Sequence, residues 1–522
     1  MLFMVIGKLL ITAFIVIGSL ILCSCSTQAP SNIHPYTEGA MFQAPVININ
    51  NYKSVHSRPE NQAGLAAMVA ISGGGERAAN LGLGVLAGLE SIKFPNSGRN
   101  ALQEIDYFST VSGGGMTVAT YLSGLYSHLS YYGAESNKSF SFKKALYSSG
   151  KNVKTECKRK NVKAYYNSFD RKKQVVDPCL RRHLARGYHN NIVKTLLKPK
   201  LIFTKLDRGD VLESAFSKEV LGGEWNSYDL RLGDLFVSKD SSKSPQYPQW
   251  TANATVFENG VIFPFTPQIL AEYKISGYLH ELIAIKKGEE DYIEFASNVP
   301  LSLGLTASGN FPSLIAPQTL TADHDKNNRF IHLVDGGMSD NLGLTTAMSI
   351  LDQEDKSRPK RKVLIVIDAF SDSFSPYSKY KHGPLATQVY TKLPDMPLNG
   401  QRGGIKERLE QFERGTGTKV FYLSFDDLYC RGKHDPHKED PVCAEKLFEQ
   451  LNAFYMNDDS AINKTNTLKI QQRNEGKSPF EIARGIETSY NITTTEQNFL
   501  IAVGQYLLAK NANKIKAAML GY

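Results

Sequence analysis

The sequence has little of what marks several classes of protein. It contains only 6 cysteines. Its 22 prolines and 41 glycines in 522 residues are too few for a collagen-like or proline-rich fibre. It has one long apolar run and a mean hydropathy of −0.28, which excludes a membrane protein with many spans. No repeat with a period of about 20–50 residues is visible. The 42% hydrophobic and 21% charged residues are typical of a folded protein with a buried core, and they exclude a disordered chain.

The single apolar run lies at the N-terminus. Residues 9–22 are apolar or small, a stretch shorter than the roughly 20 residues of a membrane span and typical of a signal peptide. The run ends in LCSCS, which resembles a bacterial lipobox with Leu22 at −3, Ser24 at −1 and Cys25 as the acylated residue. We therefore expect a lipoprotein signal peptide over residues 1–24 and a lipid anchor on Cys25. The alternative is an uncleaved N-terminal anchor.

The rest of the chain divides into a tether and one α/β domain. Residues 25–60 are rich in Pro, Asn and Ser and predict a tether, and residues 61–520 predict the domain. Within it, apolar runs that precede glycine turns alternate with helical patterns, which predicts a mostly parallel sheet covered by helices. Strands are expected at 66–71, 105–111, 253–263, 330–334, 362–368 and 419–424, and helices at 77–91, 116–125 and 491–512.

Two polar stretches, at about residues 130–200 and 426–478, predict insertions into this domain. The first is basic: residues 141–200 hold 17 Lys or Arg and 3 Asp or Glu, in a chain whose net charge is +9. A basic stretch of this kind suits an anionic surface, either nucleic acid or acidic lipid. A solvated insertion with no partner is the alternative.

Four further cysteines agree with export. Cys157 and Cys179 are close in sequence within the first polar stretch, and Cys430 and Cys443 within the second. Exported chains use disulfides to hold regions that have little core of their own, so we expect the local pairs 157–179 and 430–443 among the three possible connectivities. No metal site is predicted, because the spacing of cysteines and nearby histidines fits no strong zinc pattern.

The first of three glycine-rich turns reads SGGGER and follows an expected strand. Its glycines, Gly73, Gly74 and Gly75, free the backbone to aim several N–H groups at one point, and the next helix adds its partial positive charge. The Gly-Lys-Ser/Thr of a P-loop and the acidic ribose ligand of a dinucleotide site are absent. The turn therefore predicts an oxyanion hole for acyl transfer, with a plain turn as the alternative.

The second turn reads TVSGGG and places Ser112 between a strand and a helix. Gly at +2 and the tight turn are typical of a nucleophile elbow, which lifts Oγ clear of the sheet. Thr110 stands where the strict pattern has Gly, and a helix N-cap is the alternative role for Ser112. Ser109 is a competing nucleophile, but it lies within the strand and lacks flanking glycines.

The third turn reads VDGG. Asp335 ends an expected strand, where a carboxylate can accept the serine proton as a general base. A turn Asp that caps its own loop is the alternative. A triad would need a histidine, and His128, His324 and His332 do not lie in comparable glycine-framed turns. The pattern therefore favours a dyad of Ser112 and Asp335.

Taken together, SGGGERA, STVSGGG and VDGG resemble the motifs of the patatin-like phospholipases and of their relatives, the cytosolic phospholipases A. Further matches are NAT at 253–255, ASGNFPSLIAP at 307–317 and DNLGL at 340–344. The resemblance runs from about residue 64 to about residue 512 and is interrupted by the two polar stretches. It implies an α/β three-layer sandwich with a mostly parallel central sheet flanked by helices.

The resemblance also implies roles for individual residues. Ser112 would be the nucleophile and Asp335 its base. The N–H groups of Gly73, Gly74 and Gly75 would form the oxyanion hole. Arg77 would contact the substrate phosphate, as its planar guanidinium suits, with a structural ion pair as the alternative. No cofactor and no metal is implied.

The implied activity is that of a serine acyl hydrolase, a phospholipase A or lysophospholipase that cleaves fatty-acyl esters of membrane phospholipids. The alternatives are an acyltransferase that uses the same acyl-enzyme, and a non-catalytic lipoprotein that binds anionic lipid through residues 141–200. Export and the Ser–Asp signature argue against nucleic acid as a partner. We expect the mature protein to be anchored through Cys25 to a bacterial membrane, the outer membrane because Ser follows that cysteine.

Overall fold

The computed structural model describes a large part of the chain. The described residues are 64–95, 98–132, 140–143, 208–221, 230–236, 247–278, 283–285, 291–312, 315–324, 327–353, 361–370, 401–432, 435–455, 469–489 and 492–522. The expected signal peptide, the Cys25 anchor and the tether lie outside these residues. So do Cys157, Cys179 and residues 144–200 of the basic stretch.

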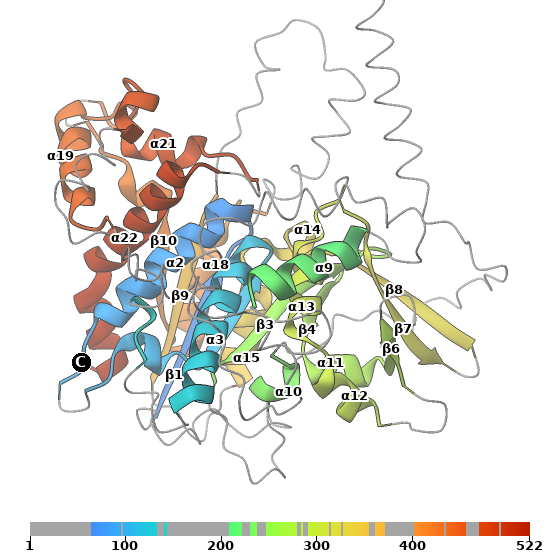
Figure 1. Cartoon of the computed structure of the whole chain (residues 1–522). Helices are drawn as coiled ribbons and strands as arrows, with labels where there is room; N and C mark the ends of the chain where they lie inside the picture. The colour runs from blue at the N-terminus through green and yellow to red at the C-terminus, as the bar shows by residue number, and fades with distance from the viewer. Residues whose placement is uncertain are drawn as a thin grey trace, which may run out of the picture.

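One mixed sheet runs through the described residues (Figure 1). Its order is β10-β9-β1-β2-β3-β8-β7-β5-β6, and β4 pairs with β3. The strands are β1 (Leu65–Ile71), β2 (Tyr107–Val111), β3 (Gln249–Val256), β4 (Ile262–Phe265), β5 (Ile275–Tyr278), β6 (Ile283–Ala284), β7 (Gln318–His324), β8 (Asn327–Asp335), β9 (Arg361–Asp368) and β10 (Lys419–Ser424).

The strands from β10 to β3 pair in parallel, and the other pairs are antiparallel. The predicted α/β fold with a central sheet flanked by helices is confirmed. The expected parallel pairing holds in the half of the sheet that carries the first two glycine turns. It fails in the other half, where β3 and β4, and β7 and β8, follow each other through connections too short for a parallel crossover.

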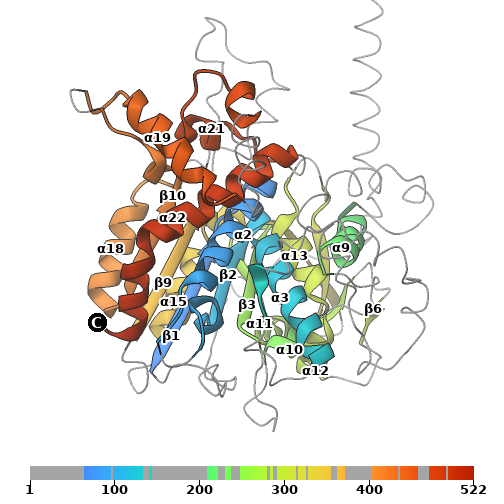
Figure 2. The same ribbon diagram turned by 60° about the vertical axis from the view of Figure 1, so that its left-hand side comes forward.

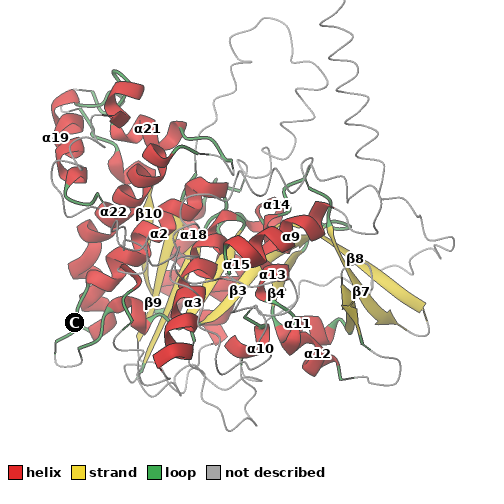
Figure 3. Ribbon diagram, viewed as in Figure 1, coloured by secondary structure: helices red, strands yellow, loops and turns green. Residues whose placement is uncertain are grey.

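Helices cover both faces of the sheet (Figures 2 and 3). On one face lie α2 (Gly75–Ser91), α3 (Gly113–Tyr132) and α22 (Thr494–Leu520); on the other lie α15 (Leu344–Gln353) and α18 (Ile405–Thr416). Right-handed crossovers impose this for the parallel strands: the chain moves across the sheet in one direction from β1 to β3 and in the other from β9 to β10, so α2 and α3 lie opposite α18. The further helices are α9 (Arg208–Glu219), α10 (Leu232–Leu235), α11 (Pro267–Glu272), α12 (Tyr292–Asn298), α13 (Leu301–Gly309), α14 (Gly337–Asp340), α19 (Pro441–Asn452) and α21 (Pro479–Gly485), with 3₁₀ turns η3 (Ala101–Glu104) and η8 (Phe425–Leu428).

Burial explains why the central strands read as continuous apolar runs. Every residue of β1 is buried, because helices cover it from both sides. The single strand expected at 253–263 is instead β3 and β4, joined by a tight turn at Gly260, whose φ is 72°. An apolar run alone does not reveal where such a turn divides it.

The C-terminal helix α22 packs closely against α2. A Cβ added to Gly84 of α2 would lie 2.2 Å from Ile501 O, and one added to Gly504 of α22 would lie 2.3 Å from Leu81 O, so the two glycines let the backbones touch. Thr493 caps α22 through a capping box with Glu496. The predicted helix at 491–512 is therefore confirmed, and it extends to Leu520.

The second polar stretch has more core than its composition indicates. Helix α19 buries Leu447, Phe448 and Leu451, so the expectation of a segment with little core of its own is wrong there. The polar residues of this helix fall on its outer face, which dilutes the apolar signal in the sequence.

The sulfurs of Cys430 and Cys443 lie 2.14 Å apart and their Cα atoms 5.8 Å apart, which is the local pairing expected for this stretch. Among the described residues, no helix combines the length and apolar composition that crossing a membrane requires. In the same part of the chain, no cluster of His, Cys, Asp or Glu is arranged to hold a metal ion.

Candidate active site

Ser112 stands at the turn between β2 and α3, at the carboxyl edge of the parallel strands. Its φ of 48° lies in the left-handed region, which residues other than glycine rarely adopt and which costs about 1–3 kcal/mol. Ser112 O accepts a hydrogen bond from Gly115 N (2.8 Å), and Ser112 N donates to Ser308 Oγ (2.9 Å). These contacts hold the strained turn that a nucleophile elbow requires.

The neighbours of Ser112 in β2 are fixed by a polar network. Ser109 is fully buried, its Oγ donates to Gly343 O (2.7 Å) and accepts from Asn253 Nδ2 (2.9 Å), so it is held away from any substrate. Thr110 Oγ1 accepts a hydrogen bond from Trp250 Nε1 (2.7 Å). The hydroxyl of Thr110 thus has a structural use, and its presence in place of Gly does not disturb the turn.

Asp335 ends β8 and faces Ser112. Its Oδ1 accepts a hydrogen bond from Gly337 N (2.8 Å). The residue is 5% exposed. Burial raises the pKa of Asp335 to about 6, and the interactions with Gly337 N and with the nearby Ser112 side chain oppose this rise. A carboxyl with this pKa is ionised at neutral pH yet basic enough to accept a hydroxyl proton in a transition state.

The first glycine turn lies directly beside the nucleophile. A Cβ added to Gly73 would lie 3.4 Å from Ser112 Cβ, and one added to Gly113 would lie 2.0 Å from Gly75 O, so the two turns touch through their backbones. Gly74 and Gly75 have φ values of 138° and 57°, which exclude ordinary side chains there. The structure therefore brings the expected oxyanion turn and nucleophile turn together.

The three glycines do not offer equal donors. Gly73 N donates to Asn341 O (2.9 Å), so its N–H is occupied and Gly73 does not fit the role predicted for it. Within the described part of the chain, the N–H groups of Gly74 and Gly75 make no hydrogen bond. These two N–H groups precede or begin α2, whose dipole adds partial positive charge at the same point.

Arg77 does not point to a substrate site. Its guanidinium is buried, with Nε donating to Ala369 O (2.7 Å) and Nη1 to Ile486 O (2.6 Å). These two bonds to main-chain carbonyls do not fit the expected contact with a substrate phosphate, and they give the guanidinium a structural role. Arg77 instead ties the start of α2 to the segment after β9 and to the residue that ends α21.

The adjacent Glu76 was not singled out by its sequence. It is 2% exposed and accepts hydrogen bonds from Ile492 N (3.3 Å) and Gln497 Nε2 (3.3 Å) at the start of α22. Burial raises the pKa of Glu76 to about 7, and the two hydrogen bonds oppose this rise. Glu76 and Arg77 thus attach the glycine turn to the segments after β9 and α21 and to the start of α22.

Among the described side chains, no candidate histidine completes a triad with Ser112 and Asp335. His332 lies on β8, its Nδ1 forms a hydrogen bond with Glu258 Oε1 at 2.5 Å, and its side chain is 42% exposed. The side chains of His128 and His324 lie outside the described residues.

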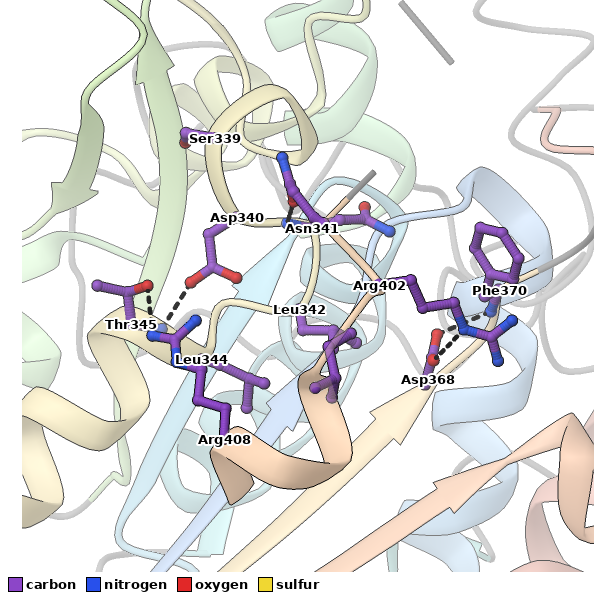
Figure 4. A pocket seen from close by; sticks show the side chains of 12 residues that line it. Ser339, Asp340, Asn341, Leu342, Leu344, Thr345, Asp368, Phe370, Arg402 and Arg408 are labelled. Atoms are coloured by element: carbon purple, nitrogen blue, oxygen red, sulfur yellow. Dashed lines mark hydrogen bonds and ion pairs between the residues drawn. The ribbon is translucent and has the colours of Figure 1, made fainter. Parts of the chain in front are cut away.

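A polar cavity of about 130 Å³ opens next to the first glycine turn (Figure 4). Asn341, whose carbonyl holds Gly73 N, lies on its wall, and Arg402 and Arg408 approach it from other sides. Arg402 stacks on the Phe370 ring (4.1 Å to the centroid) and lies 3.6 Å from Asp368 Oδ2. No local pattern in the sequence marks this cavity, because its residues come from three separate segments.

A model of the patatin-like phospholipase family matches residues 69–348, more than half of the chain, and the chain belongs to that family. The matched residues include all three glycine turns. No curated protein matches the chain.

Solved structures of human GIVD cytosolic phospholipase A2 resemble the chain at a distance. One, in complex with methyl gamma-linolenyl fluorophosphonate and terbium chloride, shares 14% identity at a TM-score of 0.34, with 88% of this chain and 59% of that chain covered. Another, of the human enzyme, shares 12% identity at a TM-score of 0.36, with 87% and 60% covered. This chain thus spans about 60% of the length of those proteins.

Proposed function

We propose that the protein is a lipid acyl hydrolase in which Ser112 is the nucleophile and Asp335 its general base. The observation that carries the proposal is the placement of a serine held at φ 48° beside a buried carboxylate whose pKa burial raises to about 6. A serine hydroxyl is a weak nucleophile at neutral pH, and an adjacent base is what activates it.

The reaction follows from this geometry. Ser112 Oγ attacks the ester carbonyl carbon while Asp335 accepts its proton, and the resulting oxyanion faces the N–H groups of Gly74 and Gly75. The carbonyl re-forms as the alcohol leaves, and the alcohol takes the proton from Asp335. Water then attacks the acyl-enzyme, Asp335 accepts a proton from this water, and the fatty acid leaves as the proton returns to Ser112.

The substrate class is proposed from the family, since its members are described as patatin-like phospholipases. We expect fatty-acyl esters of phospholipids or lysophospholipids. The lipobox-like segment ending at Cys25 supports a protein anchored to the membrane that holds this substrate. The same acyl-enzyme would serve an acyltransferase, and product analysis distinguishes the two.

The test is labelling with a fluorophosphonate, followed by mass spectrometry of the products from mixed phospholipids and lysophospholipids. Wild type should be labelled on Ser112 and should release free fatty acid, whereas Ser112→Ala should do neither. Ser109→Ala should keep the label, because the hydroxyl of Ser109 is buried and bonded to Gly343 O and Asn253 Nδ2. Labelling that survives in Ser112→Ala would refute the assignment. Transfer of the acyl group to an added alcohol in place of water would make the protein an acyltransferase.

A further inference from the structure

The end of helix α13 contacts both halves of the proposed dyad. Ser308, in its last turn, and Asn310, just beyond it, lie between the turn that carries Ser112 and the turn that follows Asp335. The sequence motif around them, ASGN, matches the family pattern but has no role in the chemistry proposed above.

The Ser308 hydroxyl is bonded in both directions. Its Oγ accepts a hydrogen bond from Ser112 N (2.9 Å) and donates one to Asn253 O of β3 (2.6 Å). The residue is fully buried, so water has no access to replace either bond. Since Ser112 lies in the turn after β2 and Asn253 lies on β3, the hydroxyl fixes the nucleophile turn relative to the sheet.

The backbone of the same segment holds the other half. Ser308 O accepts a hydrogen bond from Gly336 N (3.2 Å), and Asn310 O accepts one from Asp335 N (2.9 Å). Ser308, which binds the main chain of Ser112, therefore also binds the residue that follows Asp335, and Asn310 two positions later binds Asp335 itself. These main-chain links do not depend on any contact between the side chains of Ser112 and Asp335.

We propose that Ser308 is a positioning residue, which sets the separation of Ser112 Oγ and the Asp335 carboxylate by binding the backbone of both turns. The inference rests on the proposed function, because it concerns the same site. Without the Ser308 hydroxyl, Ser112 N is buried with no acceptor and the strained φ of Ser112 loses a constraint.

The expected effect is on rate rather than on binding. A misplacement of a reacting group by about 1 Å costs on the order of 10²-fold in rate. Ser308→Ala should therefore lower kcat about 100-fold on a soluble short-chain ester and change KM by less than about twofold. The rate of inactivation by a fluorophosphonate should fall by a similar factor, because that reaction also requires an aligned Ser112.

Ser302 provides a matched control. It lies on the same helix, is equally buried, and its Oγ donates to Glu213 Oε1 (3.0 Å), away from the dyad. Ser302→Ala removes the same hydroxyl from the same element, so it reports the general cost of such a change to α13. Ser308→Thr keeps the hydroxyl and should restore the rate of inactivation to within about tenfold of wild type.

The experiment compares kcat, KM, the rate of inactivation and the melting temperature across these variants. A loss in Ser308→Ala that exceeds the loss in Ser302→Ala at least tenfold at a similar melting temperature, with rescue by Thr, supports the proposal. Equal losses in both alanine variants, or a Thr variant as slow as Ala, would overturn it. Should Ser308→Ala not fold, Ser308→Cys decides: its thiol is a weak acceptor, and a wild-type rate in that variant refutes the role.

The two proposals fail in different ways. If wild type is not labelled by the fluorophosphonate, the proposed function fails, whatever the variants do. If wild type is labelled and Ser308→Ala behaves as Ser302→Ala does, only the positioning role fails.

Discussion

Replacing Asp335 with asparagine should stabilise the protein while it removes the activity. Burial raises the pKa of Asp335 in the folded protein to about 6, from an ordinary value of 3.8. The folded state therefore binds its proton more tightly than the unfolded state does. It follows that the contribution of Asp335 to the free energy of unfolding is greatest below pH 3.8 and is lost as the pH rises through 6.

The size of the effect follows from the shift. About two pKa units correspond to about 3 kcal/mol of destabilisation once the group is ionised in both states. The asparagine side chain has no charge to desolvate, and its oxygen can still accept the bond from Gly337 N. We expect Asp335→Asn to raise the free energy of unfolding by about 1–3 kcal/mol at about pH 8 and by almost nothing at about pH 3.5. Hydrolysis should fall by about 10³-fold or more, because the proton acceptor is lost.

Urea unfolding of wild type and Asp335→Asn from about pH 3.5 to about pH 8 measures this difference. Glu76 also has a raised pKa, about 7, so the wild-type curve alone mixes two groups. The difference between the two proteins isolates Asp335, and Glu76→Gln serves as a control that shifts stability without removing the base. An Asp335→Asn protein that is no more stable than wild type at the upper end of this range would refute the burial of an ionised carboxylate.

Four further outcomes are expected. The rate of fluorophosphonate inactivation of wild type should be half-maximal near pH 6 and about a tenth of its plateau at about pH 5, because only ionised Asp335 accepts the proton; a flat profile across this range would contradict that. Arg77→Ala should lower the melting temperature and reduce hydrolysis of phospholipid and of a neutral short-chain ester alike, since it orphans two buried carbonyls; a loss confined to phospholipid would restore the phosphate role. Cys25→Ser should remove the protein from the membrane fraction of cells, as seen by immunoblot, whereas unchanged fractionation would place the acylated cysteine elsewhere. Non-reducing peptide mapping should recover Cys430 linked to Cys443, and free thiols at both positions would exclude that bond.

The chemistry of the site was accessible from the sequence because it is encoded locally. A strand followed at once by Ser-Gly-Gly or Asp-Gly-Gly fixes where a side chain emerges at the sheet edge, so Ser112 and Asp335 could be proposed as partners from their turns alone. In the structure the two residues lie side by side, close enough for the Ser112 side chain to lower the pKa of Asp335. The same local pattern also located the two strands, one that ends just before Ser112 and one that ends at Asp335.

What the sequence could not provide depends on partners distant in the chain. In the sequence, Gly73 is indistinguishable from the other glycines of its turn, and only the structure shows that its N–H donates to Asn341 O. Arg77 has the right chemistry for phosphate, but carbonyls that lie 292 and 409 positions away hold its guanidinium. Strands β5, β6 and β7 were missed for a related reason: their sequences carry weak apolar periodicity, and pairing with one another and with β8 stabilises them.

The attachment of the first glycine turn to the C-terminal region has a consequence for folding. Glu76 bonds to Ile492, 416 positions later, and Gly75 forms a bridge with Ser489. Contacts of such high sequence separation carry a large loop-closure entropy and form late. A chain that has collapsed but has not yet docked α22 lacks these contacts to the turn that carries the proposed oxyanion donors. Esterase activity during refolding should therefore appear with the last kinetic phase, after the bulk of the helical circular dichroism signal has returned, which makes acyl transfer a reporter of complete assembly.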